Sequence, residues 1–334
     1  MPRLLIHIVT FNSASVIRHC LNSIIARPDV SVMVTDNNSS DETVEIVERE
    51  FGDRVRLVKN SSNLGYAAAH NQGLFIAKKE NFDFILILNP DAFLSADFVD
   101  VAFRSFAKHS RYTIFTPKIY RTDTIMRPYD PAIIDAAGMM LTSRARHFDR
   151  GSDTFDREQY DQECEVFGGT GAALILRMRD IDRMTLKGTK RDKDKYAVYP
   201  QLKSGEESRL PVFDEAFFAF REDAELAWRA RNMGLRTMYM PEAIAYHRRT
   251  VTHDRREFVD PKINSWSVRN RFLMQIVNFR IFNDLGMFLP GIMLWNFVVI
   301  WTVFFKERTS IPGLWEALLL TPRAIERRLL AKAA

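Results

Sequence analysis

Apolar runs alternate with helical patterns along residues 4–88. Four runs predict strands, at residues 4–10, 30–35, 55–59 and 82–88. Between them, apolar positions recur every three or four residues and predict helices at 13–25, 42–50 and 67–79. Because strand and helix alternate with short connections, we expect an α/β fold with a mostly parallel central sheet and helices on both faces.

The middle of the chain is less regular. Residues 115–120 and 172–177 predict further strands, and residues 223–233 predict a helix that ends at Gly234 in a left-handed cap. Residues 186–210 are rich in Lys, Asp, Gly and Ser, which is typical of a mobile surface loop.

The pattern changes again at residues 285–305, which contain no charged side chain. This length would permit a bilayer span of about 20 residues. The residues that disfavour a span are Pro290, Gly291 and Asn296. Those that suit a membrane interface are Trp295, Trp301, Lys306 and Arg308. We therefore expect residues 285–305 to lie on a membrane surface, with a buried helical hairpin or a true span as alternatives.

Composition narrows the class of protein. The chain has 334 residues, 46% of them hydrophobic, and a net charge of only +5. Its two cysteines, Cys20 and Cys164, have no CxxC spacing, which argues against a disulfide scaffold or a cysteine zinc site and fits a reducing compartment. We expect no signal peptide and no nucleic-acid partner; the oligomeric state is not readable from the sequence.

The fourth predicted strand stops at Asn89-Pro90-Asp91. Proline cannot donate to a sheet ladder, so the strand must end there. Asp91 then lies at the carboxyl end of a central strand, where open α/β sheets bind ligands. It is either a satisfied loop cap or, with Asn89, a ligand for phosphate-bound Mg²⁺ or Mn²⁺.

Two polar clusters follow other predicted strands or open helices. Residues 36–41, with Asp36 and Asn38, read by themselves as a helix-capping loop, and alternatively as a nucleotide contact. Asn63 and Gly65 open the third helix, where small residues let either a phosphate or another segment approach the backbone. No GxGxxG or P-loop pattern occurs there.

Two later motifs carry acid, base and metal-ligand chemistry. Glu222 and Asp223 open a helix, which the helix dipole alone would favour, but aromatic neighbours could also raise a carboxyl pKa and make a general base. His247 ends an apolar run before two arginines and is a candidate metal ligand, with His253 as a competitor.

The order of these motifs resembles that of the family 2 inverting glycosyltransferases of the GT-A fold, and most of all their bacterial rhamnosyltransferase-type branch. The resemblance covers about residues 4–275. The motifs that carry it are Val9-Thr-Phe-Asn12, Asp36-Asn-Asn-Ser-Ser-Asp41, Asn63-Leu-Gly65, Leu88-Asn-Pro-Asp91, Gly168-Gly-Thr-Gly-Ala172, Phe213-Asp-Glu215, Glu222-Asp223 and Tyr246-His247.

This resemblance implies a role for each motif. Asp223, beside Glu222, would be the catalytic base, and Asp91 and His247 would hold Mg²⁺ or Mn²⁺. Asn89 stands where the family often has the first Asp of its metal motif. The residues implied to bind the nucleotide sugar are Thr10, Asn12, Asp36, Asn38, Asn63, Gly65, Asn89, Gly169, Thr170 and Gly171.

The resemblance also implies an activity and a domain plan. We expect residues 1–262 to form the GT-A domain, with a nucleotide-binding half at about 1–110 and an acceptor half at about 111–262, and residues 263–334 to form a helical extension. The expected reaction moves rhamnose from dTDP-rhamnose to a hydroxyl of a glycan or polyprenyl-diphosphate-linked acceptor, at the cytoplasmic face of the plasma membrane.

Three alternatives to this reaction stay open. A UDP-hexose is a second possible donor for the same fold. A non-catalytic, membrane-associated nucleotide-sugar binder would use the same residues without turnover. A nucleotidyltransferase would want a glycine-rich, basic loop after the first strand, and residues 10–14 contain neither glycine nor a basic residue.

Overall fold

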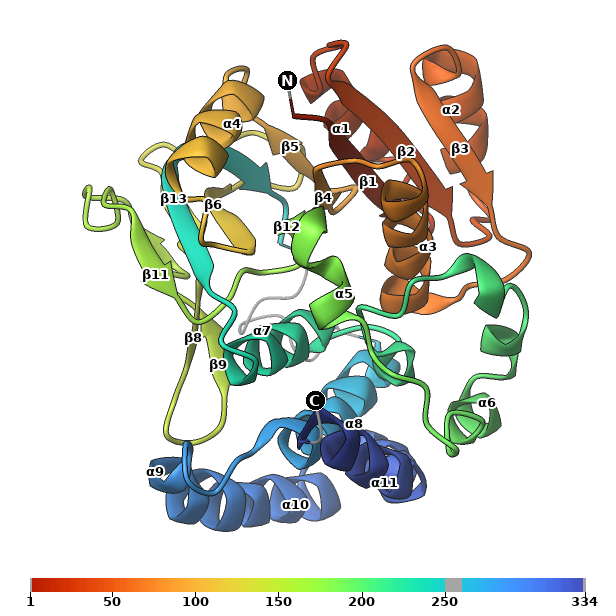
Figure 1. Cartoon of the computed structure of the whole chain (residues 1–334), viewed down its shortest axis with the longest axis vertical. Coiled ribbons are helices and arrows are strands. Elements are labelled where there is room, and N and C mark those ends of the chain that lie inside the picture. Colours follow the sequence, from red (N-terminus) through yellow and green to blue (C-terminus); the bar gives the residue numbers. More distant parts are fainter. Residues whose placement is uncertain (1, 250–259, 333–334) are drawn as a thin grey trace.

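The computed structural model describes residues 2–249 and 260–332. An 11-stranded sheet covered by helices forms its centre, and a layer of C-terminal helices lies along one end (Figure 1). The main path of the sheet runs in the order β10-β7-β6-β12-β4-β1-β2-β3. His253 falls outside the described residues.

The first half of the sheet matches its predicted pattern. β1 pairs in parallel with β2 and β4, and β2 with β3. The elements are β1 (Leu4–Thr10), α1 (Ile17–Ser23), β2 (Val30–Asp36), α2 (Thr43–Phe51), β3 (Val55–Lys59), α3 (Gly65–Lys79) and β4 (Phe84–Leu88). All five residues of β4 are buried, as a strand covered on both faces should be.

The second half of the sheet is mixed rather than parallel. β12 runs antiparallel to both β4 and β6, whereas β13 runs parallel to β6. Its elements are β5 (Ala92–Leu94), α4 (Phe98–Lys108), β6 (Ile114–Arg121), β7 (Ile133–Ala136), β10 (Thr154–Phe155), β11 (Cys164–Val166), β12 (Ala173–Arg177), α5 (Ile181–Met184), α7 (Glu222–Asn232) and β13 (Thr237–His247). The α/β class is thus confirmed, and the parallel pairing predicted for the sheet belongs mainly to the first half.

The segment 186–210 is not the mobile loop that its composition predicts. It forms α6 (Asp194–Val198) and two short 3₁₀ turns. The buried Lys195 donates to Glu215 at 2.8 Å, and the ring of Tyr199 stacks on Phe218 with centroids 4.6 Å apart. The prediction is wrong because Lys195 is paired with a buried carboxylate and is not solvated.

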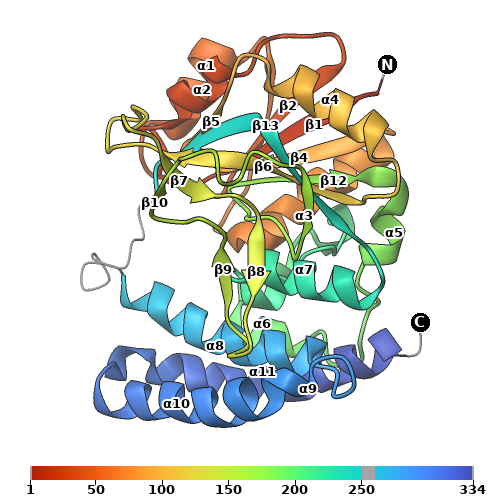
Figure 2. The ribbon, with the colours of Figure 1, turned by 90° about the vertical axis from the view of Figure 1, so that its left-hand side faces the viewer.

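The C-terminal part of the chain forms four helical segments, and a short hairpin from the middle of the chain reaches toward them. The hairpin of β8 (Met139–Leu141) and β9 (His147–Asp149) reaches down to the helical layer (Figure 2). The helices are α8 (Pro261–Asn278), α9 (Leu285–Met287) with a π-helical turn at Phe288–Trp295, α10 (Asn296–Phe305) and α11 (Ile311–Lys332). Arg323 of α11 donates twice to the buried Asp214, at 2.9 and 2.8 Å, which ties this helix to the segment that precedes α7.

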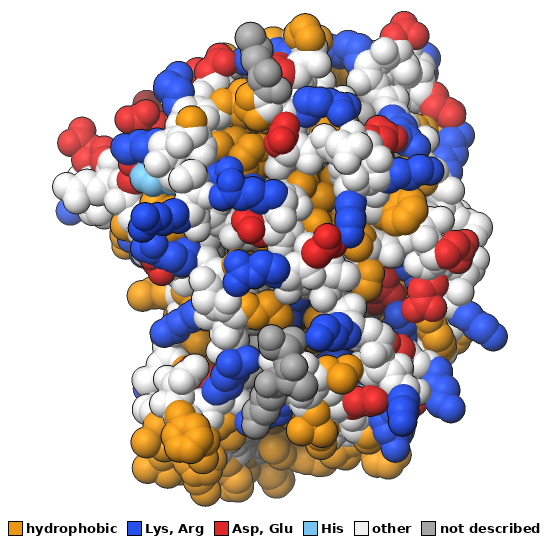
Figure 3. Space-filling model, in the orientation of Figure 1, with side chains coloured by type: hydrophobic (Ala, Val, Ile, Leu, Met, Phe, Trp, Pro, Cys, Tyr) orange, Lys and Arg blue, Asp and Glu red, His pale blue; other side chains and the backbone are white. Residues whose placement is uncertain are grey.

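The apolar segment Leu285–Phe305 lies at the surface. It is long and apolar enough to cross a membrane, yet only 11% of its most apolar window is buried. Hydrophobic side chains gather along the lower edge of the molecule, where α9, α10 and α11 lie (Figures 1 and 3). The alternative of a buried helical hairpin is therefore wrong.

Candidate active site

The loop after β4 brings Asp91 to the end of β13. The backbone N–H of Asn89 donates to the carbonyl of Ala172 at 3.0 Å, and the carbonyl of Asp91 accepts from Arg248 at 2.9 Å. β5 then pairs antiparallel with β13, so that Ala92 lies opposite His247. Two residues more than 150 positions apart in sequence are thereby held side by side.

Asp91, His247 and Asp135 form a line of charged groups. Nε2 of His247 is 3.3 Å from Oδ1 of Asp91, and its Nδ1 is 2.9 Å from Oδ2 of Asp135. Burial lowers the pKa of His247, but Asp91 and Asp135 more than offset this and raise it to about 10. Sequence reasoning missed Asp135, which belongs to no motif and lies 112 residues from His247.

Asp91 and His247 could supply two of the ligands of one divalent cation. Ligands of a small octahedral cation lie about 3 Å apart, close to the separation of Asp91 and His247. Asp135 behind the imidazole would orient it, as carboxylates do at many metal sites. No cluster of three or more His, Cys, Asp or Glu side chains able to hold a metal occurs in the described ranges, so oxygen atoms of a substrate would have to complete the shell.

The predicted base lies at the first turn of α7. Oδ2 of Asp223 accepts a hydrogen bond from the N–H of Gly171 at 2.9 Å, and burial raises its pKa. Tyr66 donates to the carbonyl of the same glycine at 2.8 Å. A Cβ on Gly171 would come within 2.5 Å of the Tyr66 hydroxyl, so any side chain there would displace Tyr66. Tyr66 is a second residue that motif reasoning missed.

Glu222 differs from its neighbour. Its side chain is buried and its Oε2 has no hydrogen-bond partner within the described part of the chain. Burial, and then the charge of Asp223, raise its pKa well above the ordinary value. A proton on Glu222 removes the repulsion between the two groups. Asp223, which has a polar partner and lies less deeply, is therefore the better candidate for proton transfer.

The segment 168–172 links the loop that carries Asp91 to Asp223. The carbonyl of Ala172 accepts from the N–H of Asn89, two residues before Asp91, while the N–H of Gly171 donates to Asp223. Thr170 is buried, and a Cβ on Gly169 would lie 2.6 Å from Cβ of Thr116. The small residues of this segment let it pass between the sheet and α7.

The polar residues at the ends of β1 and β2 bond mainly to each other. Asp36 accepts from Thr10 Oγ1 and from the N–H of Ser39, both at 2.8 Å. Asn12 Oδ1 accepts from the N–H of Ser40 at 2.8 Å. Asn38 is exposed with a φ of 65°. These contacts hold the two loops together, but none of them caps α2, whose N-cap residue makes no side-chain hydrogen bond.

The start of α3 is organised by a close contact within the protein. Asn63 Oδ1 accepts from the N–H of Gly65 at 2.8 Å. Gly65 has a φ of +79°, and a Cβ there would come within 2.6 Å of Phe218. The segment that approaches this backbone within the protein is thus Phe218, and its contact leaves no room for a side chain at Gly65. Asn37, which is not among the predicted site residues, donates to the Gly65 carbonyl at 3.2 Å.

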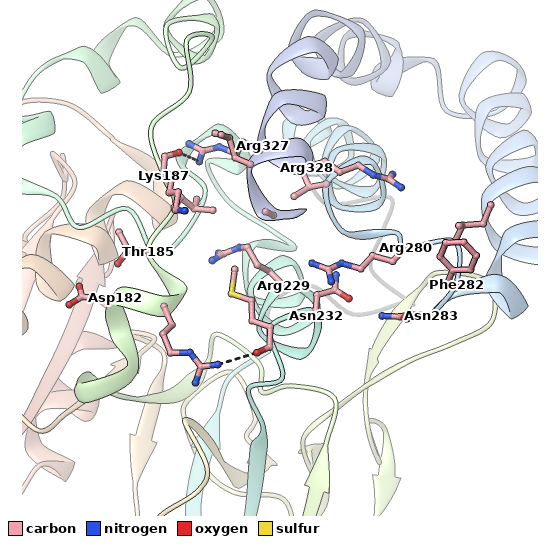
Figure 4. Close-up of a pocket in the computed structure, with 17 residues that line it drawn as sticks. Asp182, Thr185, Lys187, Arg229, Asn232, Arg280, Phe282, Asn283, Arg327 and Arg328 are labelled. Carbon is pink, nitrogen blue, oxygen red and sulfur yellow. Dashed lines mark hydrogen bonds between the residues drawn. The ribbon is translucent and has the colours of Figure 1, made fainter. Parts of the chain in front are cut away.

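A cavity of about 730 Å³ lies away from these groups, at the far end of α7 (Figure 4). Several cations line it, including Arg280 and Arg328. Arg229 and Arg327, also on its wall, are neutralised by Glu225 and Asp192, both at 2.9 Å. None of the predicted site residues lines this cavity.

Comparisons with known proteins indicate the family of this chain. The model of the family described as glycosyl transferase family 2 matches residues 5–180. Chondroitin synthase and hyaluronan synthase of Pasteurella multocida are each 28% identical over 111 residues, which is 32% of this chain but only 11% of each relative.

Solved structures with a similar fold cover nearly the whole chain. Residues 1–349 of S. aureus TarS superpose with a TM-score of 0.53 at 16% identity, covering 99% of this chain and 87% of that one. GalNAc-T7, solved with UDP, GalNAc and Mn²⁺, gives a TM-score of 0.57 at 10% identity, covering 92% and 58%. Because the family model spans more than half of its residues, this chain belongs to glycosyl transferase family 2.

Proposed function

We propose that the enzyme inverts the anomeric centre in a single displacement, with Asp223 as general base. The observation that carries this proposal is the half-buried Asp223 carboxylate, held by the Gly171 N–H with a raised pKa. A base with a pKa nearer the working pH takes a proton from a hydroxyl more effectively. The acceptor hydroxyl, activated in this way, attacks the anomeric carbon from the face opposite the leaving nucleotide.

We propose Asp91 and His247 as the residues that hold Mg²⁺ or Mn²⁺. The bound cation would neutralise charge that develops on the leaving nucleoside diphosphate. Support comes from the 3.3 Å separation of the two side chains and from the Mn²⁺ in the GalNAc-T7 structure. Asp135 fixes the orientation of the imidazole, and His247 must release its proton before it can act as a ligand.

The donor that we propose from the motif resemblance is dTDP-rhamnose. UDP-linked sugars are the second candidate, because TarS has been solved with UDP-GlcNAc and GalNAc-T7 with UDP. Both nucleotides carry a pyrimidine and a diphosphate, so the same loops would serve either. Residues proposed for this contact are Thr10, Asn12, Asp36, Asn38, Asn63, Gly65, Asn89, Gly169, Thr170 and Gly171.

We further propose peripheral attachment to the cytoplasmic face of a membrane. α11 supports this because its polarity is inverted: Arg323 and Arg327 are buried, whereas Trp315 and Leu318 are each 65% exposed. Outward apolar side chains on α10, such as Phe297, continue the same surface. A helix face of this kind is typical of one that lies in a lipid interface.

The decisive experiment measures release of nucleoside diphosphate from dTDP-rhamnose, UDP-GlcNAc and UDP-glucose, each with Mn²⁺ and with EDTA. We expect slow hydrolysis of one donor that EDTA abolishes, and an inverted sugar product by NMR. The variant Asp223→Asn should bind that donor but release little nucleotide, while Asp182→Asn, an exposed site on α5, should behave as wild type. Donor binding without release would identify a non-catalytic binder, and a retained configuration would exclude the single displacement.

A further inference from the structure

The hydroxyl of Tyr66 contacts the backbone residue that also holds the proposed base. Tyr66 lies in the first turn of α3 and donates to the carbonyl of Gly171 at 2.8 Å. The N–H of the same glycine donates to Oδ2 of Asp223 at 2.9 Å. One residue without a side chain is thus held between the phenol and the carboxylate, so its position sets how the N–H meets Asp223.

Gly171 has little space in which to move. A Cβ built on it would lie 2.5 Å from the Tyr66 hydroxyl and 3.6 Å from Oδ2 of Asp223. The residue that follows it is also fixed, because the carbonyl of Ala172 accepts from the N–H of Asn89 at 3.0 Å. Loss of the phenol hydroxyl would therefore release Gly171 on one side only, the side of α3.

The start of α3 fixes the backbone of Tyr66 through both of its neighbours. A Cβ on Gly65 would come within 2.6 Å of Phe218, and the N–H of Ala67 donates to the carbonyl of Phe218 at 3.2 Å. The ring of Tyr66 meets that of Phe213 edge-on, with centroids 6.0 Å apart. The phenol therefore leaves a rigid part of the backbone in a defined direction.

A buried pair of histidines packs against the ring of Tyr66. His70 lies one turn further along α3, with its ring centroid 4.2 Å from that of Tyr66, and its Nδ1 is 2.9 Å from Nδ1 of His7 on β1. Nε2 of His7 is in turn 2.9 Å from Oγ1 of Thr35 on β2. A Cβ on Gly73 would lie 2.2 Å from His7, so any side chain there would displace this imidazole. Two strands of the sheet thus support the ring.

These supporting groups place the phenol without adding charge. Burial lowers the pKa of His7 to about 3, and burial, followed by His7, lowers the pKa of His70 well below its ordinary value. Burial, and then the charges of Glu222 and Asp223, raise the pKa of Tyr66 well above its ordinary value. Both imidazoles are therefore neutral at neutral pH, and the phenol keeps the proton that it donates.

We propose that Tyr66 is a positioning residue, which holds Gly171 so that its N–H meets the carboxylate of Asp223. The second oxygen of this carboxylate, Oδ1, accepts from the N–H of Ala224 at 2.7 Å. The two backbone donors together fix the plane of the carboxyl group, which a base needs in order to meet a hydroxyl proton. This assignment deepens the function proposed above and rests on Asp223 being the base.

The variant Tyr66→Phe keeps the ring and removes only the hydroxyl. The N–H that the phenol positions should then bond less well to Asp223, and a carboxylate that loses a donor has a higher pKa. The other groups that face Asp223 are unchanged; they are Glu222, Arg221 and, from β9, Asp149. The acid limb of the kcat profile, where the base must be ionised, should therefore move to higher pH by about 0.5 unit or more.

The first test compares Tyr66→Phe with Tyr239→Phe. Tyr239 is buried, and its hydroxyl also donates to a backbone carbonyl, that of Tyr160, at 2.9 Å, so both variants lose the same kind of hydrogen bond. Both should melt at lower temperature than wild type.

Their kinetics should differ. On whichever of dTDP-rhamnose, UDP-GlcNAc and UDP-glucose the wild type hydrolyses, Tyr66→Phe should lower kcat about tenfold or more, keep the donor KM within about threefold, and show the shifted pH profile. Tyr239→Phe should keep the wild-type kcat and profile. The same kcat and the same pH profile in both variants would show that Tyr66 contributes only to folding, and would overturn the proposal.

A second measurement needs no substrate. The carboxyl signal of Asp223 can be titrated by carbon NMR of the full chain labelled in aspartate, and assigned by its loss in Asp223→Asn. Its pKa should rise in Tyr66→Phe and stay at the wild-type value in Tyr239→Phe; an unchanged pKa in Tyr66→Phe would overturn the proposal. Turnover of Asp223→Asn at the wild-type rate would instead refute the base, so the two proposals fail on different measurements.

A substitution on the other side of the contact does not depend on the folding of Tyr66→Phe. Gly171→Ala places a methyl group 2.5 Å from the Tyr66 hydroxyl and 3.1 Å from the ring carbon that bears it. It should displace the phenol and raise the pKa of Asp223, and it should add little in the Tyr66→Phe background, where the clashing oxygen is absent. Fully additive effects on that pKa would show that the two residues act separately, which would refute the positioning role.

Discussion

Helices α4 and α11 place their charged and apolar side chains on opposite sides. On α4, Phe98, Val101 and Phe106 are buried, while Arg104 and Lys108 face water. On α11 the arginines face the protein and the exposed side is apolar, with Ile311, Trp315, Leu318, Ile325 and Leu329. α4 thus has the polar outer side that is usual for a helix facing water, whereas the outer side of α11 is apolar. The difference separates the sheet domain, whose helices expose charged side chains, from a helical layer that exposes apolar ones.

The largest expected effect tests whether catalysis depends on the sheet domain and not on the helical layer. Asp223→Asn should lower turnover by about 10²–10⁴-fold, because the base is lost while the Gly171 contact can be kept. Vesicle binding should not change. Leu318→Ala is the opposite case, with donor hydrolysis at the wild-type rate and weaker vesicle binding. Comparable losses of turnover in both variants would show that the two regions are not separable.

Breaking the anchor of α11 should cost the most stability. Asp214→Ala leaves Arg323 buried without its carboxylate and should destabilise the fold by about 3–5 kcal/mol in urea denaturation. The control is Asp182→Ala, whose partner Lys78 is itself well exposed, and it should cost less than about 1 kcal/mol. Similar midpoints for the two would mean that the buried pair does not hold the helix.

The inverted polarity of α11 can be tested with two leucines of the same helix. Leu320 is 1% exposed and Leu318 is 65% exposed. Leu320→Ala should lower the free energy of unfolding by about 2–5 kcal/mol, and Leu318→Ala should change it by no more than about 0.5 kcal/mol. Sedimentation with anionic lipid vesicles should rank them the other way, with Leu318→Ala binding more weakly. A Leu320→Ala variant as stable as the wild type would contradict the buried position of Leu320.

The smallest effect concerns pH. Since the folded pKa of Glu222 is raised, its folded form binds a proton more tightly than the unfolded chain does. Its contribution to stability is therefore full below the ordinary carboxyl pKa and is lost as pH rises through the folded pKa. Glu222→Gln should become more stable than wild type over that window, by at most about 1.4 kcal/mol per pH unit. Thermal melts across pH check this, and the exposed Glu207→Gln should track wild type at every pH.

Tertiary contacts determine the surroundings of some residues, such as Lys195 and Gly65, that the neighbouring residues in the sequence do not indicate. Lys195 lies in a segment whose composition predicts a solvated loop, yet Glu215 binds it in the interior. Gly65 carries a small-residue signal that is equally consistent with phosphate binding and with close packing, and the contact with Phe218 is visible only in the tertiary structure. Neither partner can be inferred from neighbours along the chain.

The sequence by itself determined the strand–helix alternation of residues 4–88, the ends of most strands, the left-handed cap at Gly234 and the ordered motifs that indicate the family. These depend on backbone geometry and on apolar periodicity, which act over a few residues. Only the tertiary structure decided that Asp135 supports His247, that Tyr66 and Asp223 share Gly171, and that α11 turns its arginines inward. Each of these arises because burial makes a charge or a polar group find a partner, and such partners lie far away in sequence.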